Sequence, residues 1–557
     1  MSLRSFVVLI AAAGVVAAGC SSSAPKATAA ASTSTTTTTV AANVGAPYNR
    51  PACTSKAGAA VVATPVRGAT SDHDVVSFDG TTIRAHWFPR ARTAGVTSPT
   101  VMKGPGWGQA GDTDTTSGGY GLFGDLNISA LNTAGYNVLT WDPRGFGKSG
   151  GTIETDSAEF EGRDAQRLID WVAQQPGVQL DGRGDPRLGM VGASYGGGIQ
   201  LVTAAIDCRV DAIVPQLAWH SLGPSLYMAQ TVKSGWGDLL YTTAAGHKLD
   251  PHITSAHTVG DDTGVLSAAD VKWFLDRGPG DLVRHITAPT LIEQGTIDTL
   301  FALNEAVINF GILQSQHVPV AMLWMCSGHG VCLTPPGDQQ RPGQAAIAWL
   351  DRWVKNDTTV PVGPRFEYVD QNGISRAADQ YPLPAGAPIT ASGAGTLTLA
   401  TGGGSGPAHA TGDTGPVGGI SLAIAPAKAT HAVNVAINPA NAANVVGAPK
   451  LTLTYSGTSP AGARPTRVFA QLVDDLSGVV IGNQITPIAV TLDGQSHTTT
   501  VPLETVAYTA RPGAKITLQI VATTTAYAQP RLGGTIVLRA VKIELPTVDG
   551  LAVNALK

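Results

Sequence analysis

The sequence lacks any cluster of basic residues and carries a formal net charge of -4 at pH 7. Without a positively charged patch the chain has no electrostatic means of holding a phosphate backbone, so we expect no nucleic-acid partner. Beyond the N-terminal segment it also lacks an apolar run of the roughly 20 residues that a membrane span needs. No cysteine pair has the spacing of a zinc knuckle. What remains is a chain of 557 residues that is long enough for several domains.

The N-terminus has the pattern of an export signal. Arg4 is followed by an apolar run from Phe6 to Ala18, which is too short to span a bilayer, so residues 1–19 are predicted to be a signal peptide. The sequence Ala17-Ala18-Gly19-Cys20 resembles a bacterial lipobox, in which Cys20 is lipidated and becomes the mature N-terminus. We therefore expect a protein anchored to the outer face of the cytoplasmic membrane, with ordinary cleavage and full secretion as the alternative.

Residues 20–50 are predicted to form a disordered tether. Serine, threonine and alanine dominate this stretch, and such residues cannot bury enough apolar surface to order the chain. A random coil of about 25 residues spans on the order of 25 to 30 Å. We expect this segment to hold the folded body away from the membrane. The lipid anchor is the only contact that we expect between the protein and the membrane.

Four cysteines remain besides Cys20. An even number in an exported protein favours two disulfides, although buried free thiols are the alternative. Of the three pairings, we favour Cys326 with Cys332, which leaves Cys53 with Cys208.

Strands alternate with helical patterns over much of the chain. The segment from Asp74 alternates around Asp79-Gly80, which predicts a hairpin. Short buried strands are predicted at 99–103, 136–141, 188–191, 212–215, 290–292 and 318–325, and an amphipathic helix at 159–174. This order is typical of a mostly parallel sheet covered on both faces by helices. We expect an α/β fold whose main domain has two parts, residues 51–219 and 284–358.

A sharp turn from strand to helix is predicted around Ser194, in the sequence Gly192-Ala193-Ser194-Tyr195-Gly196. A serine at such a turn has a strained backbone, and only very small residues fit two positions before and after it. The strain exposes the hydroxyl above the sheet and directs the N–H of Tyr195 at a developing oxyanion. A glycine-rich turn without function is the alternative for this short pattern.

The other two members of a catalytic triad follow in the order that α/β-hydrolases use, acid and then histidine. Asp298 lies just beyond the strand at 290–292, and His329, between two glycines, lies just beyond the strand at 318–325. Some hydrolases carry the acid one strand earlier, but Pro215 to Trp219, which follow Val214, contain no carboxylate. Of the 12 histidines, His329 alone combines this order with a strand end, and His220 is the runner-up.

Further residues are predicted around the same site. The second oxyanion donor is expected to be the backbone N–H of Trp107, in the glycine-rich loop after the strand at 99–103. We expect His220, Trp219 and Tyr227 to line the substrate pocket. A Gly-x-Gly-x-x-Gly pattern begins at Gly145, but no helix opens directly behind it, so no dinucleotide site is expected there. We predict neither a cofactor nor a metal.

Two more domains are predicted. Residues 220–283 interrupt the strand pattern with a helical, aromatic segment, which at this point in the chain would lie over Ser194 as a cap; an irregular extra layer is the alternative. Residues 359–557 are rich in threonine, valine, alanine and glycine, with short alternating runs and few helix signals. They predict a C-terminal all-β, jelly-roll-like sandwich.

Four motifs together resemble one known family. They are D-P-R-G-F-G-K-S-G at 142–150, G-A-S-Y-G-G at 192–197, Q-G-T-I-D-T-L-F at 294–301 and G-H-G at 328–330. The chain from Asp74 onwards is similar to the X-Pro dipeptidyl-peptidase and cocaine-esterase family. The resemblance implies an α/β-hydrolase domain with a helical cap, a C-terminal jelly roll, and Ser194, Asp298 and His329 as the triad. Cocaine-esterase-like members have a tyrosine in the first oxyanion loop, where this chain has Trp107.

The sequence therefore predicts an exported serine hydrolase that cleaves a small ester or amide, or a short peptide, through an acyl-enzyme. Release of X-Pro dipeptides is the second choice, although no acidic site for a substrate's free amine is recognisable. A non-catalytic envelope protein whose sandwich binds glycan or polymer is the alternative from another class.

Overall fold

The computed structural model describes residues 48, 50–53, 60–91, 95–121, 124–407, 421–550 and 554–555. The predicted signal peptide, the predicted lipidation site Cys20 and nearly all of the predicted tether lie outside these residues. Within the described ranges, no helix is both long and apolar enough to span a membrane.

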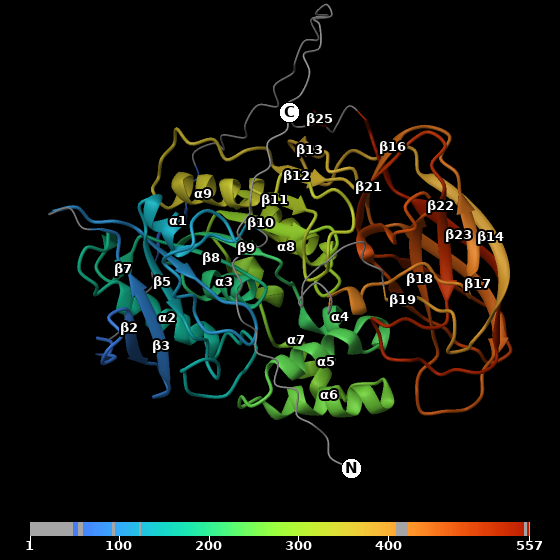
Figure 1. Ribbon diagram of the computed structural model, residues 1–557, viewed down its shortest axis with the longest axis horizontal. Coiled ribbons are helices and arrows are strands. Elements are labelled where there is room, and N and C mark those ends of the chain that lie inside the picture. Colours follow the sequence, from blue (N-terminus) through green and yellow to red (C-terminus); the bar gives the residue numbers. More distant parts are fainter. Residues whose placement is uncertain are drawn as a thin grey trace, which may run out of the picture. The chain divides into compact units, whose positions relative to one another are not determined.

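A large mixed sheet is formed by strands from the N-terminal two thirds of the chain, together with one short strand, β25, near its C-terminal end (Figure 1). Its central strands, from β5 to β12, are parallel to one another, and the strands at the β1 side are antiparallel. In order across the sheet, the twelve strands are β1 (Ala63–Pro65), β2 (Asp72–Val76), β3 (Thr82–Phe88), β5 (Asn137–Trp141), β4 (Thr100–Lys103), β8 (Leu188–Ala193), β9 (Val210–Gln216), β10 (Thr290–Gly295), β11 (Val320–Met325), β12 (Phe366–Val369), β13 (Ser375–Ala378) and β25 (Asn554–Ala555). A separate small hairpin pairs β6 (Leu180–Gly182) with β7 (Asp185–Pro186).

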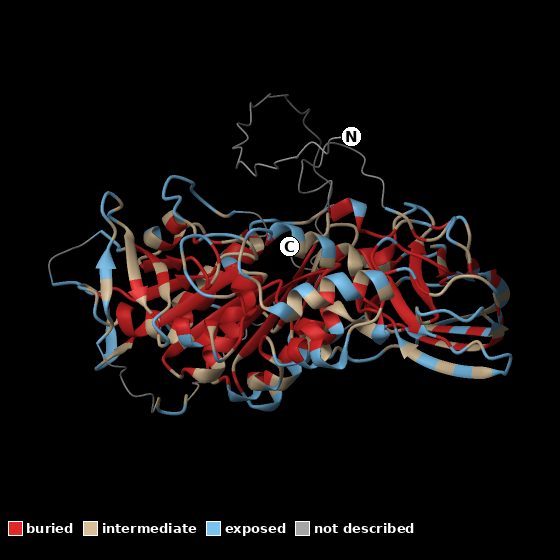
Figure 2. Cartoon of the chain, turned by 90° about the horizontal axis from the view of Figure 1, so that it is seen from below, coloured by how far each residue is buried: buried red, intermediate tan, exposed pale blue. Residues whose placement is uncertain are grey.

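Helices cover both faces of this sheet, as the alternating pattern predicted. Apolar residues of α2 (Glu161–Val172), α3 (Tyr195–Ile206), the 3₁₀ helix η3 (Gly280–His285) and α8 (Leu303–Ser315) share one core with strand residues such as Met190 and Met322. Residues of α1 (Ile128–Thr133) and α9 (Arg341–Trp353) share the other core with Val191 and Leu323. Neighbouring strand residues therefore point to opposite faces, both of them buried. Figure 2 shows the central strands as almost wholly buried.

The segment between β9 and β10 is helical, in agreement with the predicted cap. It contains α4 (Leu222–Leu226), η2 (Met228–Gln230), α5 (Ser234–Thr243), α6 (Pro251–Thr263) and α7 (Ala268–Leu275). The sequence defines α6 locally: the Asp250 side chain accepts from the N–H of His252, Pro251 occupies the first turn, and Gly264 ends the helix at φ 72°. These are the residue types that begin and end helices.

The C-terminal part of the chain is a β-sandwich. Two four-stranded sheets share one apolar core, to which strands such as β15 contribute every second residue. One sheet contains β14 (Ile389–Thr398), β23 (Thr535–Leu545), β17 (Lys450–Thr458) and β20 (His497–Pro502), and the other contains β15 (Val433–Ile437), β22 (Ile516–Val521), β18 (Arg467–Asp474) and β19 (Thr486–Ala489). A smaller sheet joins β21 (Val506–Ala510), β16 (Ala443–Gly447) and β24 (Thr547–Val548).

The predicted start of the sandwich at residue 359 needs correction. Strands β12 and β13 follow this point, but they continue the large sheet, where β12 pairs with β11 in parallel. Phe366 and Tyr368 pack into the core of that sheet, and Glu367 accepts a hydrogen bond of 2.9 Å from Arg341 on α9. The first strand of the sandwich sheets is therefore β14.

Two disulfides are present, with the pairing favoured from the sequence: Cys53 with Cys208, and Cys326 with Cys332. Beside the first one, Arg50 donates to the carbonyl oxygens of Cys208 and Val210, at 2.6 Å each, and pairs with Asp211 at 2.9 Å. The N-terminal end of the described chain is thus fixed to the turn between α3 and β9.

Candidate active site

Ser194 stands at the turn between β8 and α3. Its backbone has φ 57° and ψ -117°, a combination that non-glycine residues rarely adopt. Its N–H donates to the carbonyl oxygen of Gln216 on β9, at 2.9 Å, so the strained residue is held against the neighbouring strand. This is the sharp strand-to-helix turn that the sequence predicted.

The glycines around Ser194 are required by close approach of the loop after β4. A methyl group on Gly196 would stand 2.2 Å from the carbonyl oxygen of Gly104, and one on Gly192 would stand 2.5 Å from the same atom. Gly192 also has φ 139°. A side chain at either position would push the Gly104 loop away from the serine.

Asp298 follows β10 and is fully buried. Its Oδ1 accepts from the N–H groups of Leu300, at 2.9 Å, and Phe301, at 2.8 Å. Its Oδ2 lies 2.7 Å from Nδ1 of His329. The loop beyond the strand thus holds the carboxylate in one orientation, with one oxygen turned towards the histidine.

His329 follows β11 and lies between Asp298 and Ser194. Its Nε2 is 2.8 Å from the Ser194 Oγ, so the hydroxyl, the imidazole and the carboxylate form one chain of hydrogen bonds. A methyl group on Gly328, which has φ 139°, would come within 2.6 Å of Asp298 Cβ, and one on Gly330 would come within 2.5 Å of the Ile297 carbonyl oxygen. The flanking glycines allow the two loops to meet, and the Cys326–Cys332 disulfide closes the histidine loop.

The cap and the loop after β10 each contribute an aromatic wall beside the imidazole. The Trp236 and Phe301 rings meet that of His329 edge-on, with centroids 5.7 and 5.3 Å away. The indole N–H of Trp236 donates to Thr299 Oγ1 at 3.0 Å, and the buried Lys233 ammonium donates to the Leu300 carbonyl oxygen at 2.9 Å. Burial lowers the pKa of Lys233. Helix α5 is thereby attached to the loop that carries Asp298.

A cavity of about 110 Å³ opens beside Ser194 under the cap. Its lining is mainly aliphatic and aromatic. It includes Trp107, Trp219, Leu222, Leu226, Leu240, Ile253, Phe274 and Phe301, together with the polar residues His257 and Asp261. A cavity of this composition suits an apolar group of small to moderate size.

Two of the three predicted pocket residues lie elsewhere. Trp219 lines the cavity, whereas neither His220 nor Tyr227 is among the described residues that do. The His220 ring is turned to α8, where its Nδ1 lies 2.9 Å from Asn309 Oδ1, and its backbone N–H donates to Glu305 at 2.7 Å. The Tyr227 residue ends the short helix α4.

The structure places both oxyanion candidates beside the serine. Tyr195 is the first residue of α3, where backbone N–H groups have no acceptor within the helix. Trp107 lines the cavity, its ring meets that of Tyr195 edge-on at 5.4 Å, and its indole N–H donates to Leu240 on α5 at 2.9 Å. The tryptophan side chain therefore braces the loop after β4 against the cap.

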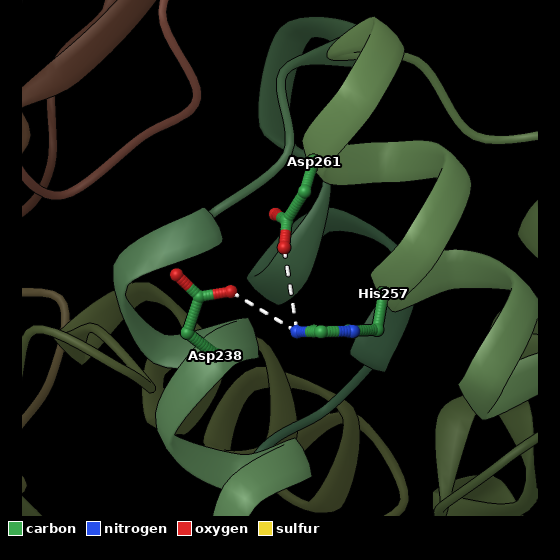
Figure 3. Close-up of side chains that lie close together, drawn as sticks. All are labelled: Asp238, His257 and Asp261. Atoms are coloured by element: carbon green, nitrogen blue, oxygen red, sulfur yellow. Dashed lines mark ion pairs between the residues drawn. The ribbon is translucent and has the colours of Figure 1, made fainter. Parts of the chain in front are cut away.

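An ionic cluster that sequence reasoning missed lies on two cap helices (Figure 3). Nε2 of His257 is 3.2 Å from Asp238 Oδ1 and 3.3 Å from Asp261 Oδ2. Burial and the neighbouring Asp238 raise the pKa of Asp261 to about 6. Both carboxylates face the same ring nitrogen, so without a bound ion that nitrogen donates a proton to them; the three ligand atoms also lie within 4.8 Å of one another, close enough together to hold a metal ion. The i,i+4 spacing of His257 and Asp261 is visible in the sequence, but the contribution of Asp238 from another helix is not.

Comparison with known proteins finds a family model that is similar to part of the chain. Residues 79–330 match the X-Pro dipeptidyl-peptidase (S15 family). An uncharacterised 31.7 kDa protein from the traX-finO intergenic region of Escherichia coli is 35% identical over 152 residues, which are 27% of this chain and 51% of that protein. The chain spans about half the length of the curated relatives it matches.

Solved structures share the fold at low sequence identity. A CocE/NonD family hydrolase from Staphylococcus aureus is similar with a TM-score of 0.62 and 12% identity, covering 91% of this chain and 100% of that one. An α-amino acid ester hydrolase is similar with a TM-score of 0.65 and 12% identity, covering 86% and 98%. These findings confirm the predicted family resemblance and the predicted fold class. The residues matched by the family model include Ser194, Asp298 and His329.

Proposed function

We propose that the chain hydrolyses an ester or amide through an acyl-enzyme formed on Ser194. In this proposal Oγ of Ser194 attacks the substrate carbonyl while Nε2 of His329 accepts its proton and later gives it to the leaving group. Asp298 keeps the imidazole in the required tautomer and stabilises its positive charge. The observation that carries the proposal is the hydrogen-bonded chain from Ser194 through His329 to Asp298, with separations of 2.8 and 2.7 Å.

The backbone N–H groups of Tyr195 and Trp107 are the proposed oxyanion donors. The position of Tyr195 at the start of α3 supports the first assignment, because this end of a helix favours negative charge. The place of Trp107 in the loop packed against Gly196 supports the second. Loss of one such donor typically costs about 2.7 to 4 kcal/mol of transition-state stabilisation.

Covalent labelling with a fluorophosphonate tests the nucleophile. We expect the intact protein to be labelled at one site, Ser194→Ala to remain unlabelled, and Ser221→Ala, which changes a serine of the cap, to be labelled normally. An intact, folded protein that is not labelled would contradict the proposal.

Ester or amide hydrolysis is the first choice for the reaction because the cavity beside Ser194 is largely apolar. Such a wall binds an acyl group by removing its surface from water, at about 0.8 kcal/mol for each buried CH₂. A series of straight-chain p-nitrophenyl esters should therefore show kcat/KM rising with chain length until the cavity is full.

Release of X-Pro dipeptides is a second candidate, and the Asp238–His257–Asp261 cluster favours it. His257 and Asp261 line the same cavity as Ser194, and carboxylates there could bind the free amine of a peptide substrate. Since the pKa of Asp261 is about 6, its carboxylate is ionised above that pH and protonated below it. Hydrolysis of Gly-Pro-anilide should then fall as the pH drops below 6.

Variants of the cluster separate the two candidates. If the chain is a dipeptidyl-peptidase, Asp261→Asn should lower kcat/KM for Gly-Pro-anilide by tenfold or more and leave a short acyl ester within twofold. Asp262→Asn, a neighbouring change outside the cluster, is the matched control. If the chain hydrolyses acyl esters but neither Gly-Pro- nor Ala-Pro-anilide, only the esterase assignment remains supported.

We also propose that the protein is exported and anchored through a lipid on Cys20. The lipobox-like sequence supports the anchor, and two disulfides are in keeping with an oxidising compartment. The full-length protein should partition into the detergent phase of a cell extract, and Cys20→Ala should move to the aqueous phase. Equal partitioning of both forms would refute the anchor.

A further inference from the structure

The loop between β18 and β19 of the sandwich reaches the two loops that carry Asp298 and His329. Its 3₁₀ turn η4 (Ile481–Asn483) and the following residue make two side-chain hydrogen bonds across the boundary. Nε2 of Gln484 donates to the backbone carbonyl oxygen of Asp298 at 2.7 Å. Nδ2 of Asn483 donates to the carbonyl oxygen of Val331, two residues beyond His329, at 3.1 Å.

These two side chains stand on a rigid base. Ile481 is buried in the sandwich core, and Ile485 is buried in an adjoining cluster, so the segment is anchored on both sides. Gly482 has φ 66° and Asn483 has φ 52°, and two successive left-handed residues make a tight turn. Asparagine adopts this conformation more readily than most residues. Asn483 and Gln484 are themselves almost fully buried.

The bond from Gln484 completes the hydrogen bonding of Asp298. The carboxylate is held by the Leu300 and Phe301 N–H groups and by His329, whereas the backbone carbonyl is held by Gln484. The acid and the histidine lie on separate loops, and their spacing depends on what bridges those loops. Adjacent residues of the sandwich loop provide one such bridge.

We infer that Asn483 and Gln484 are positioning residues that set the separation of Asp298 and His329 from the sandwich side. They act through the backbone of the two loops and touch no reacting atom. The inference rests on the proposed roles of Asp298 and His329. It also gives the sandwich a part in the reaction, because a displacement of about 1 Å in a catalytic group can lower the rate about a hundredfold.

The chain offers a matched control for these bonds. Gln371, in the turn between β12 and β13, also contacts a sandwich strand: its Nε2 donates to the Thr509 carbonyl oxygen at 2.8 Å, and its Oε1 accepts from the Thr509 N–H at 2.9 Å. This contact crosses the same boundary with the same side chain, but it reaches neither triad loop. Gln371→Met removes more hydrogen bonds than Gln484→Met does.

The test compares Gln484→Met, Asn483→Gly and Gln371→Met with the parent enzyme. Glycine at 483 keeps the left-handed turn and removes only the side chain. We expect Gln484→Met and Asn483→Gly to lower kcat for a short acyl ester by about tenfold, to leave KM within twofold, and to slow fluorophosphonate labelling of Ser194 in proportion. Gln371→Met should lower the Tm at least as much and leave kcat within twofold.

Two results would overturn the inference: kcat within twofold of the parent in both loop variants, or a loss of kcat in Gln371→Met equal to that in Gln484→Met. Labelling and turnover by the parent enzyme report separately on the proposed function. A parent that neither labels nor hydrolyses esters would refute that proposal, whereas an active parent with unaffected loop variants would refute the positioning role alone.

Discussion

Replacement of Asp298 by asparagine is the sharpest test of how the three side chains work together. Oδ1 of Asp298 accepts from two backbone N–H groups, so in the variant the amide oxygen must take this place. The amide NH₂ then faces Nδ1 of His329, which lies 2.7 Å from Oδ2 in the parent. That nitrogen must become an acceptor, and the ring proton moves to Nε2, which faces Ser194.

An imidazole in this tautomer cannot accept the serine proton. In a serine-protease triad the same change lowers kcat by about 10⁴, which corresponds to about 5.4 kcal/mol of activation free energy. We expect a loss of this size in Asp298→Asn, measured with a p-nitrophenyl ester, with a Tm close to that of the parent because the loop keeps its acceptor.

Asp298→Ala separates the two roles of the carboxylate. It leaves the N–H groups of Leu300 and Phe301 without this acceptor, so the Tm should fall in the alanine variant and not in the asparagine variant. A kcat for Asp298→Asn within tenfold of the parent value would refute the argument from the tautomer.

Other features give further predictions. Gly196→Ala should lower esterase activity at least a hundredfold, because the added methyl would stand 2.2 Å from a backbone oxygen; normal activity would show that the loop can move. Burial raises the pKa of Glu293 to about 8. Above about pH 4.5 its carboxyl group therefore loses its proton in the unfolded state but keeps it in the folded state. As the pH rises from there towards 8, the folded state becomes less stable relative to the unfolded state. Relative to the parent, Glu293→Gln should therefore gain stability between pH 5 and 8 in urea titrations, by at most about 1.4 kcal/mol per pH unit. If the unfolding free energies of parent and variant change with pH in the same way, this prediction is wrong. Cys53→Ala opens a loop of 155 residues and should cost up to ~5 kcal/mol of unfolding free energy. Opening the six-residue loop with Cys326→Ser and Cys332→Ser should cost only ~2 kcal/mol but should lower kcat more than Cys53→Ala does. The reverse ranking in kcat would show that the Cys326–Cys332 disulfide does not restrain the histidine.

The three residues predicted as the triad share one property: each follows the carboxyl end of a parallel strand. Ser194, Asp298 and His329 come directly after β8, β10 and β11, and parallel strands bring such positions to one edge of a sheet. Short apolar runs and glycines are enough to find these strand ends. The fold class could be predicted for the same reason.

The residues that sequence reasoning misplaced or missed depend on orientation between elements. Periodicity shows that the cap is helical, but it does not show which side faces the serine, so Tyr227 was wrongly expected in the cavity and Asp238 was overlooked. The assignment of β12 to the sandwich was wrong because a strand of four residues carries no sign of its neighbour. Gln484 is remote in sequence from the loop that it contacts, and no local pattern marks it.

The covalent link at Cys53 has a mechanical consequence for a protein held by its N-terminus. If Cys20 is fixed in a membrane, a pulling force enters the folded body at residues 50–53 and passes through the sulfur bridge to the turn before β9. The force then acts on β9, a strand in the middle of the sheet, and not on the edge strand β1. Shear at the cell surface would have to break a chemical bond before it reached the outer strands.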